Sequence, residues 1–422
     1  MIPILVYAAI FIGAFYIVRY INEKTAIQDY TSLKTVTFGD ESAVRSNKMA
    51  SAISIITIFF MWATFTGSSL LPSFLHMPGP FVGETSFTYT VRDADGATDK
   101  ADVTVVVYKF GEEVEKPVVD GGDGFAKNDV ATIKKWGSGL VHVQKNDEIS
   151  KSDGAVIVSI DGQSVGPGET VEVNGGVIKL NDKGTPNFKA GKGWQMEPLY
   201  LPSPEAVWKR TLKIADEGFR NFSLWEHLGF SLFRVVAGFF FGALVGIPLG
   251  YAMGLSDWFR GWFDPIVEFM RPVPPLALIP LVIIWAGIEE EGKIILLFLA
   301  ALWIMAIAAR SGVSGVKITK VHAAYSLGAS KAQIMRYVIV PNSLPEIFTG
   351  ARVAMGVCWG TVVAAELVAA SQGAGMMIMV ASKFQNTDIV IMGIILIGII
   401  GFGIDMLMRW AERILVPWKG KG

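Results

Sequence analysis

The strongest constraint on this chain is a series of apolar stretches, each about as long as a helix that crosses a lipid bilayer. Such a helix needs roughly 20 apolar residues. The candidates are Ile2–Ile21, Ala50–Leu71, Leu228–Leu255, Asp264–Gly287, Lys293–Gly312, Thr349–Ala370 and Asp388–Trp410. Hydrophobic residues make up 51% of the chain and its mean hydropathy is +0.44, which is too apolar for a soluble protein of 422 residues. We therefore expect a mostly α-helical protein that crosses the membrane several times.

Charge and reactive side chains exclude several functions. With 37 basic and 38 acidic residues, the chain has no charge excess that would favour a nucleic-acid partner. Cys358 is the single cysteine, so no intrachain disulfide forms and a thiol metal site is not expected. The histidines are scattered without a nucleophile–base pattern, and no G-x4-G-K-[ST] phosphate loop occurs. We expect neither an enzyme nor a cofactor bound by this chain.

The distribution of basic residues predicts how the chain is oriented. Residues 1–21 are interpreted as an uncleaved anchor with its N-terminus outside; no basic residue precedes the apolar run and no cleavage site follows it, which disfavours a signal peptide. Residues 22–49 then form a cytoplasmic link to the span in residues 50–78. The acidic turn Glu289–Glu291 falls outside. Basic residues after the last span place the C-terminus inside: Arg409, Arg413, Lys419 and Lys421.

Residues 79–197 have a different composition and contain no spanning segment. The stretch SFTYTVRDADGATDKADVTVVV alternates polar and apolar residues around Asp-Ala-Asp-Gly, which predicts a β-hairpin. Short strand patterns follow, and together they predict an extracytoplasmic β-sandwich. This region resembles the bacterial immunoglobulin/cadherin-like repeats of surface proteins, in a permuted order. Asp93, Asp95 and Asp99 are weak Ca²⁺ candidates, and a turn stabilised by aspartate hydrogen bonds is the alternative.

Two features of residues 198–422 bear on helix packing. Gly238, Gly242, Gly246 and Gly250 recur every four residues, so one helix face is small enough for close contact with another span. The segment around Pro274 and Pro275 is rich in proline, which breaks helices and is tolerated in a membrane only where protein or a water-filled cavity satisfies the backbone. We expect this segment to line a path through the protein, or to be the bent start of a span.

A polar, basic loop at residues 313–345 lies between two apolar segments, as expected for a cytoplasmic loop. Its alanines and serines, interrupted by Gly328, predict two short helices that meet at a turn. Permeases of ATP-binding-cassette (ABC) importers carry a loop of the form E-A-A-x3-G-x9-I-x-L-P, and this loop resembles it. The matching residues are Ala323, Ala324, Gly328, Val338, Val340 and Pro341, with His322 in place of the glutamate.

The resemblance extends through Ala50–Pro78 and from Leu199 to the end, to the taurine branch of the nitrate/sulfonate/taurine importer permeases. It implies a type I importer permease core in a bacterial inner membrane, paired as a homodimer. It also implies two ATPase subunits that carry the ATP and Mg²⁺, and an extracytoplasmic binding protein that delivers taurine or a related sulfonate. The residues that the ATPases would contact are His322, Ala323, Ala324, Leu327, Gly328, Ala329, Ser330 and Pro341.

Charged residues within spans are costly and usually face a cavity or a partner. Taurine carries a sulfonate and an ammonium, so an acid and a base beside the path would suit it. The candidates are Glu366, Arg234, Arg352, Pro274 and Pro275. The alternative is that Glu366 pairs with a neighbouring helix for structure.

Other functions remain open at this level. The same kind of importer could carry an alkanesulfonate or nitrate. A membrane-anchored adhesion or sensor protein would use the β region, but it would leave the loop at residues 313–345 without a purpose.

Overall fold

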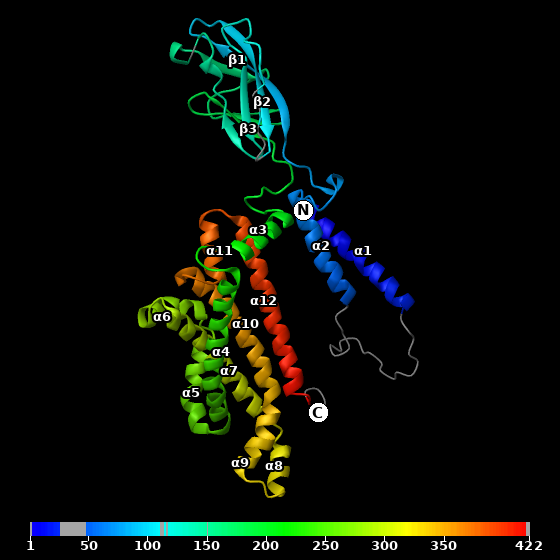
Figure 1. Ribbon diagram of the computed structural model, residues 1–422, viewed down its shortest axis with the longest axis vertical. Coiled ribbons are helices and arrows are strands. Elements are labelled where there is room, and N and C mark those ends of the chain that lie inside the picture. Colours follow the sequence, from blue (N-terminus) through cyan, green and yellow to red (C-terminus); the bar gives the residue numbers. More distant parts are fainter. Residues whose placement is uncertain (1, 26–47, 110–113, 115–116, 150, 419–422) are drawn as a thin grey trace. The chain divides into compact units, whose positions relative to one another are not determined.

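The computed structural model describes residues 2–25, 48–109, 114, 117–149 and 151–418 of the chain. Most of the predicted link at residues 22–49, and the basic residues Lys419 and Lys421, lie outside the described residues. The chain divides into two compact units, Met1–Glu205 and Ala206–Gly422. The first contains two helices and a β region, and the second is entirely helical (Figure 1).

Five helical stretches of the described chain are long and apolar enough to cross a membrane. They are α2 (Lys48–Thr66), α4 (Leu224–Leu255), α7 (Glu290–Ser314), the run Lys331–Val368 and α12 (Thr387–Leu415). Helix α1 (Ile2–Thr25) is a further candidate from sequence, but the apolar part counted in the structure, Ala8–Ile21, is shorter than a span. The prediction of a mostly helical, multi-span protein with an added β region is confirmed.

The predicted span Asp264–Gly287 is broken rather than straight. Helix α5 (Asp257–Met270) ends before the prolines, and the chain resumes as η5 (Pro275–Leu278) and α6 (Ile279–Ala286). The two halves are bent by 93°. Pro274 and Pro275 occupy this bend, because proline fixes the backbone and cannot donate the helical hydrogen bond.

The remaining helices of the second unit are short except for one. They are α3 (Pro204–Glu217), α8 (Ile318–Ser326), α9 (Lys331–Ile334), the π-helix η6 (Met335–Ile339), α10 (Val340–Ala369) and α11 (Ala374–Lys383). Helix α10 continues from α9 and η6, so the three form the single run counted above.

The glycine-bearing face of α4 packs against α7. A side chain at Gly242 would meet the carbonyl oxygen of Phe298 at 2.8 Å, and one at Gly246 would meet the carbonyl oxygen of Leu302 at 2.6 Å. Backbone contact this close requires glycine, as in other small-residue helix interfaces. The sequence predicted a close-packed face, and the structure identifies α7 as its partner.

The β region contains two sheets. The first has the order β3-β2-β1-β5-β6 and the second β4-β9-β8-β7. The strands are β1 (Gly83–Arg92), β2 (Thr98–Tyr108), β3 (Asp129–Lys134), β4 (Ser138–Leu140), β5 (Val156–Ile160), β6 (Gln163–Ser164), β7 (Thr170–Val173), β8 (Gly176–Leu180) and β9 (Pro186–Ala190). Side chains from both sheets share one core, including Val103 and Val105 from the first and Ile178 and Phe188 from the second.

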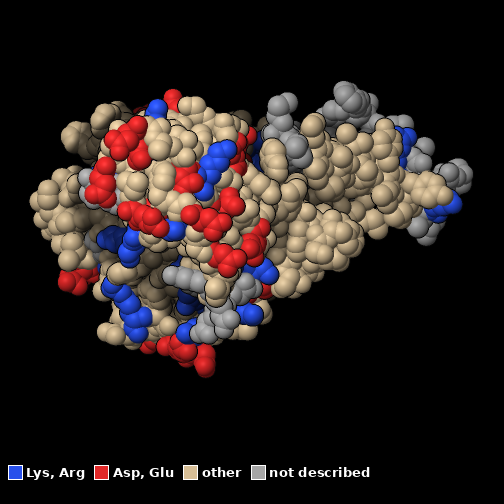
Figure 2. Space-filling view, turned by 90° about the horizontal axis from the view of Figure 1, so that it is seen from above, with Lys and Arg blue, Asp and Glu red and all other residues tan. Residues whose placement is uncertain are grey.

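The predicted hairpin is formed by β1 and β2, which pair antiparallel from Gly83↔Val107 to Arg92↔Thr98. Their inward residues alternate as a half-buried sheet requires. Figure 2 shows charged side chains of both signs gathered over the β region, whereas the surface of α1 and α2 is almost uncharged. This contrast matches a water-exposed domain attached to lipid-exposed helices.

The two ends of the β region are joined by a hydrogen-bonded stem. The backbone N–H groups of Trp194 and Gln195 donate to the carbonyl oxygen of Pro78, and the side-chain amide of Gln195 donates to Met77. The hydroxyl of Ser68 donates to Glu205 at 2.6 Å. The chain therefore enters and leaves the β region through paired backbone segments instead of two free linkers.

Candidate functional site

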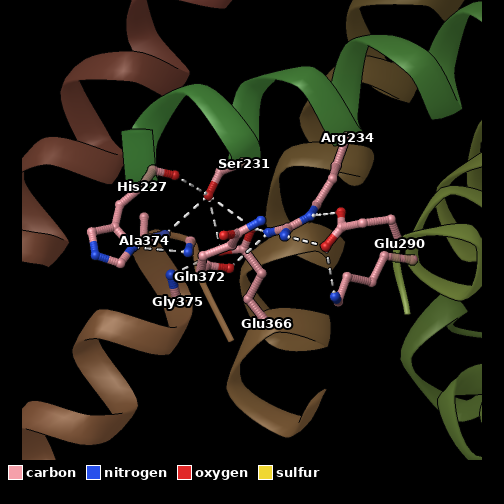
Figure 3. A network of polar contacts seen from close by, with 10 residues as sticks. His227, Ser231, Arg234, Glu290, Glu366, Gln372, Ala374 and Gly375 are labelled. Atoms are coloured by element: carbon pink, nitrogen blue, oxygen red, sulfur yellow. Dashed lines mark hydrogen bonds and ion pairs between the residues drawn. The ribbon is translucent and has the colours of Figure 1, made fainter. Parts of the chain in front are cut away.

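Two regions of the helical unit contain most of the site residues predicted from sequence. The first is a largely buried set of polar and charged side chains on α4, α7 and α10, of which Arg234 and Glu366 were predicted. We call it the Arg234 network: Ser231, Arg234, Glu290, Lys293 and Glu366. Figure 3 shows the Arg234 side chain reaching from α4 between the two carboxylates. Its guanidinium donates to Glu366 at 2.5 Å and to both oxygens of Glu290 at 2.5 and 2.6 Å.

Both carboxylate oxygens of Glu366 accept hydrogen bonds from partners within the protein. Ser231 donates its hydroxyl to the carboxylate at 2.8 Å, and the N–H of Gly375 donates to it at 2.9 Å. The side chains of Arg234 and Glu366 are both 0% exposed. Removing one member of a buried ion pair leaves the other charge unpaired, which costs about 3–5 kcal/mol. The arrangement therefore ties α4 to α10 strongly as long as both members are present.

The charges of the Arg234 network balance. Lys293 lies one turn after Glu290 on α7 and donates to it at 3.0 Å. Two carboxylates thus face one guanidinium and one ammonium. Because these four groups come from three helices, the network fixes the helices relative to one another at one end of the bundle.

The turn between α10 and α11 is held by the same set of contacts. Arg234 also donates to the carbonyl oxygen of Gln372 at 3.0 Å, and Ser231 accepts from the N–H of Ala374 at 3.0 Å. Gly373 has a φ of +130° and lies against the Glu366 carboxylate, where any side chain would collide. Glycine is required here both for its backbone angle and for space.

His227, one turn before Ser231 on α4, extends the contact to the chain before the helix. Its Nδ1 accepts from the N–H of Gly373 at 3.1 Å, so the proton is assigned to Nε2, which donates to the carbonyl oxygen of Phe219 at 3.1 Å. The ring is fully buried. This hydrogen-bond pattern requires the neutral imidazole, because a second ring proton would face the Gly373 N–H.

The other predicted path residues lie elsewhere. Arg352 is 14 residues before Glu366 on α10, about 21 Å along the helix. It pairs with Asp405 at 3.3 Å and Glu412 at 3.7 Å, both on α12. Pro274 and Pro275 lie at the bend between α5 and α6. The structure thus brings Arg234 and Glu366 together and separates them from Arg352.

The second region is the coupling segment, residues 317–345. It forms α8 and α9, joined at a turn where Gly328 has a φ of +80°, so the predicted pair of short helices is confirmed. Ser330 begins α9 with a capping box, in which its hydroxyl accepts from the N–H of Gln333 and the Gln333 side chain accepts in return. The turn is therefore defined by local contacts.

The coupling segment exposes apolar and aromatic side chains. Leu327 is 88% exposed, Tyr325 50% and Tyr337 68%. His322, Ala323, Gly328 and Ser330 are also exposed, whereas Ala324 and Ala329 are half-buried. At the far end, the carbonyl oxygen of Pro341 accepts from the Trp418 indole at 3.1 Å. Exposed apolar residues next to ordered helix ends are typical of a surface that binds another protein.

The three aspartates of the hairpin do not form a common site. Asp93 accepts hydrogen bonds from the N–H groups of Asp95 and Ala97, as in an ordinary turn. Asp99 instead accepts from Lys100 and Ala126. Within the part of the chain that the structure describes, no cluster of three His, Cys, Asp or Glu residues could hold a metal ion.

Comparison with known proteins identifies the helical unit. Residues 242–416 match the family model described as binding-protein-dependent transport system inner membrane component. The taurine transport system permease protein TauC of Escherichia coli (strain K12) is 48% identical over 227 residues, which cover 54% of this chain and 82% of TauC. The chain belongs to this family of ABC importer permeases. Permease subunits of this family are multi-pass membrane proteins and are not catalytic.

Other relatives of this permease cover a similar share of the chain. The putative aliphatic sulfonates transport permease protein SsuC of Escherichia coli (strain K12) is 37% identical over 54% of this chain and 84% of its own length. The nitrate import permease protein NrtB of Synechocystis sp. is 31% identical over 54% of this chain and 86% of its own. A solved chain of the MetNI methionine ABC transporter aligns over 44% of the permease and 93% of that chain, with 20% identity and a TM-score of 0.40. The assignment rests on the sequence relatives.

Sequence reasoning missed three members of the Arg234 network and the histidine beside it. Glu290 was interpreted as part of an external turn, and Lys293 as the start of a span. Ser231 lies three residues before Arg234, a spacing that places both on one helix face and could have indicated a shared partner. His227 lies one turn before Ser231 and could have been found by the same rule.

Proposed function

We propose that this permease imports taurine or a closely related small sulfonate. The observation that supports this best is the 48% identity to the taurine permease, against 37% for the alkanesulfonate and 31% for the nitrate relatives. Alkanesulfonate or nitrate import by the same mechanism is the second candidate, because solute specificity in such systems is expected to reside largely in the binding protein.

The proposed machine contains two copies of this permease, two ATPase subunits and an extracytoplasmic binding protein. In this proposal the coupling segment is cytoplasmic, the C-terminus is cytoplasmic and the N-terminus lies outside. The ATPases bind Mg-ATP and contact the largely exposed stretch from His322 to Ser330, with Pro341 at the base of the segment. Closure of the ATPases moves α8 and α9, and η6 transmits the movement to α10, with which it is continuous.

We further propose that the Arg234 network fixes the helices around the path, while the bend at Pro274 and Pro275 lines it. Both partners of the central ion pair are fully buried, and their polar atoms have internal partners. The uptake kinetics of Glu366→Gln test this. A structural role predicts less assembled protein with an unchanged KM, whereas direct contact with the solute predicts a raised KM in correctly assembled protein.

The β region is proposed to contact the binding protein or to cap the external mouth of the permease. Its two ends are joined to each other by the hydrogen-bonded stem at Pro78 and Gln195, so the region begins and ends at one place. Deletion of residues 84–197 is expected to weaken docking of the binding protein. An adhesion or sensor role instead predicts unchanged uptake and docking after the deletion.

The solute assignment is tested with the extracytoplasmic binding protein of the proposed machine, which we expect to be encoded beside this chain. A titration of that protein with taurine, hypotaurine and alkanesulfonates, followed by uptake in vesicles with the complete transporter, identifies the substrate. Preference for taurine supports the proposal. Preference for nitrate or a longer alkanesulfonate, with taurine unbound, would assign the permease to the second candidate.

A further inference from the structure

A cluster of three arginines lies at the C-terminal end of α12, away from the Arg234 network. A hollow there is lined by Arg352 of α10 and by Arg409, Glu412, Arg413, Val416 and Pro417 of α12 and its continuation. The carboxylates in contact with these arginines are Asp405 and Glu412, at 2.7–3.7 Å. Among the described residues, three guanidinium groups against two carboxylates leave one positive charge at the hollow.

The arginines that remain accessible are the two on α12. Arg409 is 55% exposed although it pairs with Asp405 one turn earlier. Among the described residues, the Arg413 side chain forms no ion pair and no hydrogen bond. Arg352, at 27% exposed, lies deeper and is held by both carboxylates. The hollow therefore offers guanidinium donors to an incoming anion at its rim.

A row of exposed apolar side chains continues from these arginines along the same face of α12. Arg413, Arg409, Met406, Phe402 and Ile399 follow one another at steps of four and three residues, which places them in one row. Met406 is 56% exposed, Phe402 66% and Ile399 61%. The row thus joins a cationic end to an apolar stretch within a candidate membrane span, of which only 17% is buried.

We infer that this row binds an anionic phospholipid, with the phosphate group at Arg409 and Arg413 and an acyl chain along Met406, Phe402 and Ile399. A phosphodiester supplies the single negative charge that balances the hollow, and guanidinium groups bind phosphate oxygens bidentately. Basic pockets at the membrane surface bind lipid head groups in this way. A free phosphate ion would bind the arginines but would make no contact with the row of apolar side chains.

The experiment is a lipid titration of the purified full-length protein, followed by native mass spectrometry. The probes are phosphatidylglycerol, phosphatidylcholine and inorganic phosphate. Each arginine near an anionic head group strengthens lipid binding about five-fold. The double variant Arg409→Gln/Arg413→Gln is therefore expected to bind phosphatidylglycerol about thirty-fold more weakly. The double variant Arg409→Lys/Arg413→Lys is expected to retain most of the binding.

A matched control is Arg260→Gln on α5. Arg260 is 57% exposed and also has a carboxylate one turn away, Asp264 at 3.9 Å. Phosphatidylglycerol binding by this variant is expected to equal that of the unaltered protein. If the double glutamine variant does not fold, Arg413→Gln alone is expected to weaken binding about five-fold.

Three results would overturn the inference. The first is phosphatidylglycerol binding that is the same with and without the two arginines, or that Arg260→Gln reduces equally. The second is equal binding of phosphatidylcholine, which carries no net charge. The third is displacement of the lipid by inorganic phosphate at equal concentration, which would assign the hollow to a free anion. None of these outcomes depends on which solute the permease carries.

Discussion

The Arg234 network and the coupling segment lie in the same helical unit but differ in exposure. The network buries paired charges, whereas the coupling segment leaves apolar side chains exposed. In the network, Arg234 and Glu366 are fully buried, and their side chains are paired with groups on other helices and in the turn before α11. In the coupling segment, Leu327 is 88% exposed, and side-chain hydrogen bonds such as those of Lys320 and Ser330 stay within the segment. A region whose buried charges are all paired within the chain stabilises the fold. A region that leaves apolar side chains exposed is suited to bind a partner.

Arg234→Met should produce the largest effect on stability. It leaves the carboxylates of Glu366 and Glu290 without their guanidinium, and we expect a loss of about 3–5 kcal/mol in the free energy of unfolding. The measurement is denaturant unfolding in detergent. Arg409→Met is the control, because that arginine is exposed, and its effect should stay within about 0.5 kcal/mol. Equal stability of the two variants would contradict the proposed role of the network.

Leu327→Asp should weaken binding of the ATPase and leave the stability of the permease unchanged. Because the side chain is exposed, the unfolding free energy should not change, but binding of the ATPase should weaken by about 2 kcal/mol or more, roughly thirty-fold, if Leu327 is an interface hot spot. The assay is co-purification of the ATPase together with ATP-driven uptake. Ile318→Asp, at another exposed position before the turn, shows whether any added charge has this effect.

Gly246→Val tests the close contact of α4 with α7. A side chain there would meet the backbone of Leu302 at 2.6 Å, so the helices must separate, at a cost of about 1–3 kcal/mol. Gly229 on the same helix has open space around its Cβ position, and Gly229→Val should be nearly neutral. Thermal unfolding of the two variants provides the comparison, and similar midpoints would argue against α7 as the partner.

The β region contains two half-buried carboxylates, Asp129 and Asp147, without a guanidinium between them, and its stability should depend on pH. Burial and the facing carboxylate of Asp147 raise the pKa of Asp129 to about 7, and Tyr89 donates to both groups. Burial also raises the pKa of Asp147, whereas the N–H and charge of Lys127 oppose that rise. The folded state therefore holds more protons than the unfolded chain between about pH 4 and pH 7.

It follows that the stability of the β region falls as pH rises through this window, by about 1 kcal/mol after allowance for partial exposure. Hydrogen exchange of β1 and β2 amides in the full-length protein, corrected for intrinsic rates, should show more protection at pH 5 than at pH 7. Asp129→Asn should remove most of the difference, and Asp182→Asn, at an exposed position, should leave it unchanged. Greater protection at pH 7 would reverse the sign that the contacts predict.

Sequence reasoning succeeded where the signal is local. Five of the seven predicted spans, the hairpin around Asp93 and the helix–turn–helix at Gly328 each depend on residues close together in the chain. It failed where the partner is distant. Arg234 and Glu366 were both singled out, but 132 residues separate them, and nothing in their spacing shows that they form a pair.

The bend at Pro274 illustrates a second limit. Proline in the apolar segment predicted a break, but the 93° angle depends on how α6 packs against α7, through contacts such as those of Val282 and Leu296. Similarly, the glycine row on α4 predicted close packing without naming α7. Residue spacing determines which face of a helix is used, and only the folded structure determines what lies against it.

Cross-linking from the tip of the coupling segment tests most directly whether this segment binds the ATPase. A Leu327→Cys variant, with buried Cys358 replaced by alanine, would be labelled at its single thiol with a short maleimide–benzophenone reagent and photo-cross-linked in the assembled transporter, with and without ATP. If the coupling segment contacts the ATPase, a cross-link forms to the nucleotide-hydrolysing subunit, and its yield changes when ATP binds. A cross-link to the extracytoplasmic binding protein, or none to the ATPase in a complex that still transports, would contradict this contact.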